Sequence, residues 1–91
     1  MDYVFCTDAG CWTELADTHN FNGELAPATS VRACQDACWH NDSCDGFDWN
    51  PGQPVGQQCW LSGPWTSFRN ITQPGITLYI LNRDDCRKFA V

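Results

Sequence analysis

The stretch "ACQDACWHNDSC", residues 33–44, places three cysteines within eleven residues. Such a cluster can be a zinc site, a redox centre or a disulfide staple, and these belong to different compartments. Its spacings are C-x3-C and C-x5-C. Zinc sites usually take paired ligands from C-x2-C turns, and thioredoxin-like centres carry C-x-x-C beside a βαβ pattern. The spacing therefore favours disulfides over metal or redox chemistry, and we expect no metal and no cofactor.

Length and charge limit the remaining possibilities. The 91 residues suffice for one small domain, whose hydrophobic core is marginal without cross-links. The net charge of −6 disfavours nucleic acid, heparin and anionic membranes as general partners, because each requires a basic patch. No apolar run is long enough for a membrane span, so we expect no membrane insertion. We expect residues 1–10 to form an N-terminal arm or edge strand and residues 11–91 to form a single domain.

Two sequons indicate an extracellular location. "NDS" begins at Asn41 and "NIT" at Asn70, both in segments expected to be polar loops. Together with the cysteines they predict a secreted, disulfide-bonded glycoprotein. The first residues show neither the basic nor the apolar region of a signal peptide. We therefore expect that a signal was removed or that the sequence is one piece of a longer chain.

One helix is predicted around the cysteine cluster, in the segment "SVRACQDACWHN". Thr29 or Ser30 can cap its N-terminus by accepting a backbone N–H. Cys34 and Cys38 recur at helical spacing and share one face, while Trp39 lies half exposed on the flank. That cysteine-bearing face is expected to pack on a sheet.

Four segments predict strands, and they are "CWTEL", "CDGFDWN", "QQCWLSG" and "PGITLYIL". In the second, Phe47 and Trp49 share one face and Asp48 points to the other; in the third, Trp60 points away from the Cys59 face. The last strand is apolar on both faces, which is typical of a central strand covered on both sides. Residues 19–30, "HNFNGELAPATS", predict a loop. The expected fold is α+β, an antiparallel β-sheet with one disulfide-stapled helix packed across it.

The order of these cysteines, helix and strands resembles that of the PAN/Apple domain family. A helix with C-x3-C, a third cysteine soon after, "C-x-G-F-x-W", then "CWL" and a late strand ending in cysteine cover residues 11–86. Such domains occur in plasma prekallikrein and at the N-termini of plasminogen and hepatocyte growth factor. Sequence alone leaves the cysteine pairing open. The resemblance implies three bridges, which are Cys11–Cys86, Cys34–Cys59 and Cys38–Cys44.

One of the seven cysteines, Cys6, remains outside this pattern. In an oxidising compartment an odd cysteine suggests a bond to another molecule or to a further part of the chain. The alternative is a free or capped thiol. Because Cys6 and Cys11 are close in sequence, either could take Cys86 as its partner, and the family pattern favours Cys11.

No catalytic constellation is recognisable, so we predict that the protein is not an enzyme. His19 and His40 are expected to be ordinary surface imidazoles. Asp42, Asp45 and Asp48 are expected to be solvated carboxylates, because they lack the spacing of a calcium loop. Known PAN/Apple domains are themselves not enzymes, so the resemblance implies the same.

The best candidates for a binding surface are aromatic side chains near loops, namely Trp39, Trp60, Trp65 and Phe68. The sequence predicts an extracellular PAN/Apple-like module that mediates protein–protein or protein–carbohydrate binding in adhesion. The alternative is a glycosylated structural subunit that assembles with copies of itself, through Cys6 and the N-terminal arm, into an extracellular coat, matrix or filament. If the arm and the long loops instead cover these aromatic residues, they form part of the core.

Overall fold

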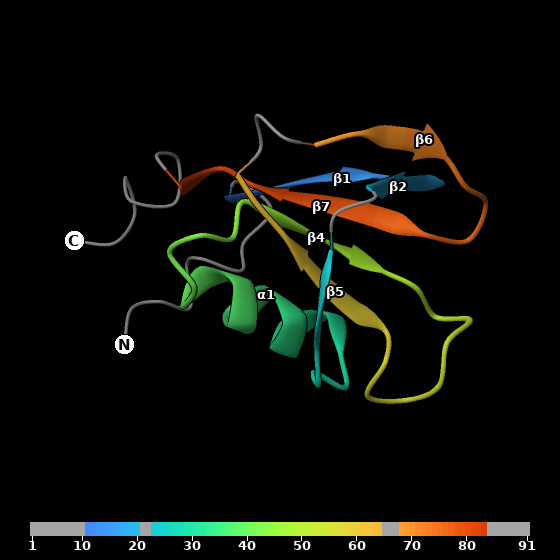
Figure 1. The fold of residues 1–91 in the computed structure, drawn as a ribbon, viewed down its shortest axis with the longest axis horizontal. Helices are drawn as coiled ribbons and strands as arrows, with labels where there is room; N and C mark the ends of the chain where they lie inside the picture. Colours follow the sequence, from blue (N-terminus) through green and yellow to red (C-terminus); the bar gives the residue numbers. More distant parts are fainter. Residues whose placement is uncertain (1–10, 21–22, 65–67, 84–91) are drawn as a thin grey trace.

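A computed structural model describes residues 11–20, 23–64 and 68–83, and the statements below apply to those residues. The elements follow the chain in the order β1 (Trp12–Leu15), β2 (Thr18–Asn20), β3 (Glu24–Ala26), α1 (Val31–Trp39), β4 (Gly46–Trp49), β5 (Cys59–Ser62), β6 (Asn70–Thr72) and β7 (Thr77–Leu81). Figure 1 shows one helix below a sheet and a short ribbon above it. The expected α+β fold, an antiparallel sheet with a disulfide-stapled helix, is confirmed.

Five strands form the main sheet in the order β1-β7-β4-β5-β3, and every neighbouring pair is antiparallel. Strand β7 lies between β1 and β4, as its two apolar faces predicted. β2 and β6 form a separate two-stranded ribbon. Within the described part of the chain, no helix has the length and apolar character needed to cross a membrane.

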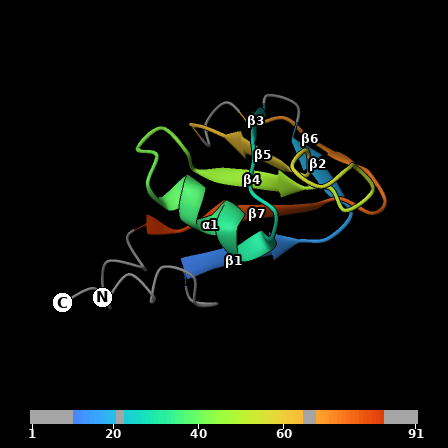
Figure 2. The same cartoon turned by 90° about the horizontal axis from the view of Figure 1, so that it is seen from below.

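The helix covers one face of the main sheet. The register places Phe47 of β4 opposite Leu61 of β5 and Tyr79 of β7, so these three side chains share that face. Phe47 is fully buried, stacks on Tyr79 with ring centroids 4.7 Å apart and meets Trp12 edge-on at 5.4 Å. Aromatic pairs in these geometries add to the stabilisation that burial gives. The core therefore lies between α1 and this face (Figure 2).

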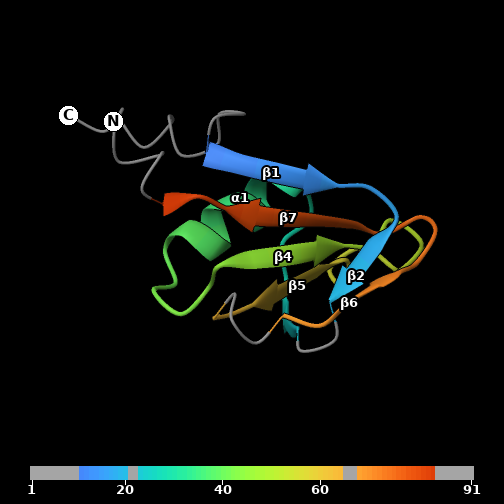
Figure 3. The same ribbon diagram turned by 90° about the horizontal axis from the view of Figure 1, so that it is seen from above.

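The β2–β6 ribbon lies over the opposite face. Adjacent residues of a strand point to opposite faces, so Asp48 and Trp60 point away from the helix. β2 contacts both β4 and β7, and Figure 3 shows the ribbon crossing one end of the sheet. The sheet is therefore covered on both faces, by a helix on one and by a polar ribbon on the other.

Two disulfides fasten the helix. Cys34 of α1 is bonded to Cys59 of β5, and Cys38 is bonded to Cys44 in the loop that follows the helix. Both pairs are those that the family resemblance implied. Cys11 is fully buried beside them. Its expected partner Cys86, and also Cys6 and residues 1–10, lie outside the described residues.

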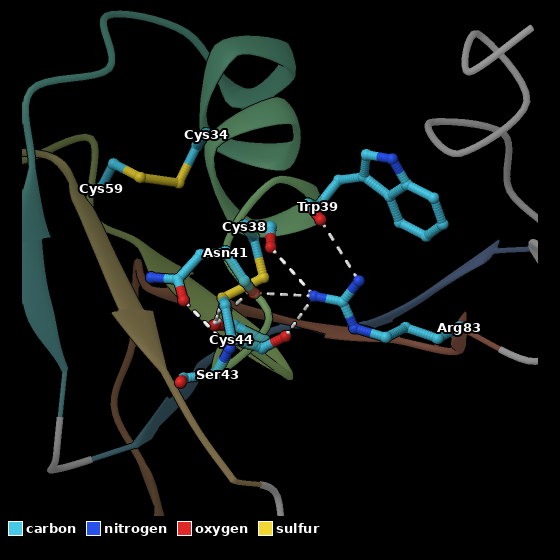
Figure 4. Close-up of a disulfide and its surroundings, with 9 residues drawn as sticks. Cys34, Cys38, Trp39, Asn41, Ser43, Cys44, Cys59 and Arg83 are labelled. Atoms are coloured by element: carbon cyan, nitrogen blue, oxygen red, sulfur yellow. Dashed lines mark hydrogen bonds between the residues drawn. A yellow bond between two sulfur atoms is a disulfide. The ribbon is translucent and has the colours of Figure 1, made fainter.

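Each end of α1 has a capping group. At the N-terminus the Ser30 hydroxyl accepts the Ala33 backbone N–H at 3.1 Å, which decides between the two caps that the sequence offered. At the C-terminus the Arg83 guanidinium donates to four backbone carbonyls, at distances of 2.9–3.2 Å. These carbonyls belong to Cys38, Trp39, Asn41 and Cys44 (Figure 4). The Arg83 guanidinium also lies 5.2 Å from the centre of the Trp39 ring. A cation at this end also complements the helix dipole.

Two predicted loops are wrong. Residues 19–30 contain most of β2 and all of β3, and the sequon at Asn70 lies in β6 rather than in a loop. Each of these strands has only three residues. Their partners are distant in sequence, because β2 pairs with β6 and β3 with β5. Strands this short have no alternation long enough to detect, and their existence depends on tertiary pairing.

Replacing Arg83 by alanine should destabilise the protein by about 2–4 kcal/mol, because four carbonyls lose a charged donor. Lysine should restore only part of the loss, since an ammonium group cannot reproduce the planar fork. Urea unfolding of Arg83→Ala and Arg83→Lys measures this. Arg32→Ala is the matched control, because Arg32 is exposed on the same helix and should change stability little. Equal effects at Arg32 and Arg83 would contradict the capping role.

Candidate functional site

A pocket of the described structure lies between the β2–β6 ribbon and the face of the sheet that points away from the helix. Its volume is about 450 Å³, within the range of small-molecule sites. The described lining consists of His19, Asn20, Gly23, Asp48, Asn50, Gln53, Trp60, Gln73 and Ile76. We call this the ribbon pocket. Four separate segments of the chain form it, so it exists only in the folded protein.

A buried carboxylate anchors the ribbon to the sheet at this pocket. Asp48 is only 2% exposed, and its Oδ2 lies 2.5 Å from His19 Nδ1. The backbone N–H of Asn20 donates to both Asp48 carboxylate oxygens, at 3.2 and 3.0 Å. When Asp48 is ionised, its bond to His19 requires a proton on Nδ1, so it fixes the tautomer as well as the ring orientation.

Burial and hydrogen bonding shift the pKa of the Asp48 carboxyl in opposite directions. Removal from water raises the pKa of this carboxyl above its ordinary value of 3.8, and this is the largest effect. The N–H of Asn20 and the side chain and charge of His19 lower the pKa again, by less. The three donor contacts from the ribbon therefore compensate only part of the hydration that the Asp48 carboxyl loses on burial.

A second set of hydrogen bonds fixes the turns beside the ribbon. Asp17 adopts a left-handed backbone with φ 52°, a conformation that aspartate tolerates better than most residues. Its side chain accepts the Gly75 N–H at 3.0 Å, and its carbonyl accepts the Gln73 N–H at 2.9 Å. These bonds tie the turn after β1 to the turn before β7. They place Gln73 and Ile76 in the wall of the ribbon pocket.

The opposite wall comes from residues 50–58, a loop with its own internal hydrogen bonds. Asn50 accepts the Gly52 N–H through its side-chain oxygen at 3.0 Å, and its backbone N–H donates to Gln58 at 2.9 Å. The Trp60 indole N–H donates to the Gln57 carbonyl at 3.0 Å. That bond holds the indole ring at the pocket, so the aromatic surface is positioned before any ligand arrives.

Several polar groups of the lining are available to a ligand. The side-chain amides of Gln53 and Gln73 make no hydrogen bond with any described residue, and neither does the Nδ2 group of Asn50. A carboxamide offers two donors and an acceptor with two lone pairs. The pocket thus combines one fixed aromatic surface with uncharged groups that both donate and accept.

The four aromatic residues predicted as one binding surface lie in different places. Trp60 lines the ribbon pocket, whereas Trp39 is half-buried on the helix side under Arg83. Phe68 packs over Gly46, where an added Cβ would lie 3.1 Å from its ring. Trp65 lies outside the described residues. Of the three described candidates, only Trp60 lines the ribbon pocket, and a binding role for Trp39 and Phe68 stays a prediction.

Two predicted surface groups are also misplaced. His19 was expected to be an ordinary surface imidazole, but it is 30% exposed and paired with Asp48. Asp48 was expected to be solvated and is buried, because β2 covers the face to which alternation directs it. Asp42 remains exposed. Across the described ranges, no three His, Cys, Asp or Glu residues gather as metal ligands would.

Neither a scan of protein-family models nor a search of curated proteins found a match to this chain.

The raised pKa of Asp48 gives a testable pH dependence. A carboxyl whose pKa is higher in the folded state adds stability below its unfolded pKa of 3.8. That contribution is lost as pH rises through the folded pKa. Asn is the uncharged analogue of Asp. The unfolding free energy of the native protein minus that of Asp48→Asn should therefore fall as pH rises from about 3 to 7.

Urea unfolding at a series of pH values measures this difference. Asp42→Asn is the control, because Asp42 is exposed and its difference from the native protein should stay nearly constant. A rise with pH for Asp48→Asn would show that the His19 and Asn20 contacts outweigh burial.

Proposed function

We propose that this protein is an extracellular, non-catalytic PAN/Apple-like module that binds a neutral carbohydrate in the ribbon pocket. The family part of the proposal is supported by the helix across an antiparallel sheet and by the Cys34–Cys59 and Cys38–Cys44 bonds. Two sequons and the disulfides support an extracellular location. A secreted adhesion protein is the setting in which such a module would act.

The observation that carries the ligand class is Trp60 beside the three carboxamides of Asn50, Gln53 and Gln73. A pyranose ring has an apolar C–H face and a rim of hydroxyl groups, each of which both donates and accepts. An indole ring can stack on the C–H face, and carboxamides can donate to and accept from the hydroxyl groups. Because the Trp60 N–H already donates to Gln57, its ring offers the ligand a face rather than a donor.

The charge of the lining favours neutral sugars. Its described residues include no lysine or arginine, and its single carboxylate, Asp48, already accepts from His19 and Asn20. A sulfated or sialylated sugar would therefore lose hydration without a cationic partner. Binding through uncharged groups should also vary little with salt.

The alternative function, a self-assembling structural subunit, depends on Cys6 and residues 1–10. Those lie outside the described residues, so this alternative stays a prediction.

Replacing Trp60 by alanine should weaken binding of a neutral glycan at least tenfold, as expected for a central aromatic anchor at about 1.4 kcal/mol per factor of ten. A glycan array identifies the tightest neutral ligand, and titration calorimetry then measures the affinity of each variant. Gln53→Ala and Gln73→Ala should each weaken binding by about three- to tenfold through one lost hydrogen bond.

The matched control is Gln35→Ala, the same substitution on α1 at the opposite face of the sheet. It should leave affinity unchanged. A glycan that binds equally well to Trp60→Ala, or an array on which the native protein binds nothing, would refute the proposed function.

A further inference from the structure

A second, smaller pocket lies on the other side of the sheet, beside the loop that follows α1. Its volume is about 210 Å³. Its described lining consists of Glu24, Asn41, Ser43, Cys44, Leu61, Ser62 and Gly63. Glu24 lies opposite Leu61 in the register of the edge strand β3, so their side chains share the helix-facing side. One of the two sequons, at Asn41, is therefore part of a pocket wall.

The Asn41 side chain is held in place at this wall. Its Oδ1 accepts the Ser43 N–H at 3.0 Å, while its backbone carbonyl accepts from Arg83 at 2.9 Å. Figure 4 shows the carboxamide pointing away from the Arg83 side of the loop. The Cys38–Cys44 bond closes the same loop. These contacts fix the position of the Nδ2 atom, which is the atom to which an N-linked sugar is attached.

The pocket offers one hydrogen-bond acceptor and one apolar surface. The Glu24 carboxylate makes no hydrogen bond or ion pair with a described residue. Leu61, half-buried and opposite Glu24 in the register, provides the apolar surface. The Ser62 hydroxyl is not part of this surface, because it is buried and strand alternation directs it to the other face of the sheet.

We infer that this pocket seats the first N-acetylglucosamine of a glycan carried by Asn41. In the transfer, Nδ2 loses one proton and bonds to C1 of the sugar, and the diphosphate of a lipid-linked oligosaccharide leaves. Oδ1 takes no part, so its bond with Ser43 persists. The covalent link gives the sugar a high local concentration at the pocket. Glu24 accepts from its hydroxyl or amide groups, on the side of the sheet that Leu61 also faces.

This inference rests on the secretory part of the proposed function and is independent of the ribbon pocket. The test uses the chain secreted from cells that make high-mannose glycans, with Thr72→Ala removing the other sequon. Endoglycosidase H leaves one sugar on Asn41. Adding Ser43→Ala gives the unmodified chain with Asn41 retained. The one-sugar form should melt about 4–8 °C higher, the shift that one hydrogen bond gives in a domain of this size.

Glu24→Ala removes the accepting side chain and should remove most of that difference while changing the unmodified chain little, since Glu24 is exposed. This separates a contact with the sugar from a general effect on the strand. The Asn70 sequon is the matched control, because Asn70 lines neither described pocket. One sugar there, with Ser43→Ala in place, should leave the melting temperature unchanged. Equal melting with and without the Asn41 sugar, or no modification of Asn41 by mass, would overturn the inference. Neither result affects glycan binding in the ribbon pocket, which is measured separately.

Discussion

The Cys34–Cys59 bond is the constraint on which the rest of the structure depends. It joins the only helix of the described chain to the sheet through two fully buried residues. In the chain-entropy treatment, closing a loop of 25 residues stabilises the folded state by about 3.5 kcal/mol. Closing the six-residue separation of Cys38–Cys44 adds about 2 kcal/mol. Together these values rival the net stability of a small domain. Because the disulfides fix the helix, Phe47 and its aromatic neighbours can form a core from only a few residues.

The two faces of the sheet are covered by different physical means, and β4 takes part in both. Phe47 faces the helix, where burial of aromatic rings and disulfides dominate. The next residue, Asp48, faces the ribbon, where hydrogen bonds from His19 and Asn20 dominate. Apolar side chains can pack together until they fill the space between two elements, whereas hydrogen bonds fix the distance between groups and can leave space beside them. The ribbon pocket lies on the face where the hydrogen bonds dominate, as this contrast leads one to expect.

The sequence predicted the parts of the fold that depend on local spacing. The helix with a cap at Thr29 or Ser30, and the strands around Phe47, Cys59 and Leu78, follow from periodicity and capping chemistry. Alternation also directed Trp60 and Asp48 to the face away from the helix. It could not show what covers that face. β2 is a three-residue polar strand, and the His19–Asp48 contact spans 29 positions. Such a pairing leaves no local pattern, so both residues were expected at the surface.

The same reasoning explains why the residues that line the ribbon pocket were only partly predictable. Aromatic residues are conspicuous in a short sequence, and Trp60 was among the candidates. Gln53 and Gln73 looked like ordinary loop residues. They become neighbours because Asp17 fixes one turn and Asn50 fixes another. Hydrogen bonds within the protein therefore order the backbone of both walls, so a ligand would pay little backbone entropy and would have to order only the side chains that it contacts. For the sugar that we propose as ligand, Trp60 would supply the apolar contact, and the carboxamides, carried by segments that those two turns position, would select the hydroxyl pattern.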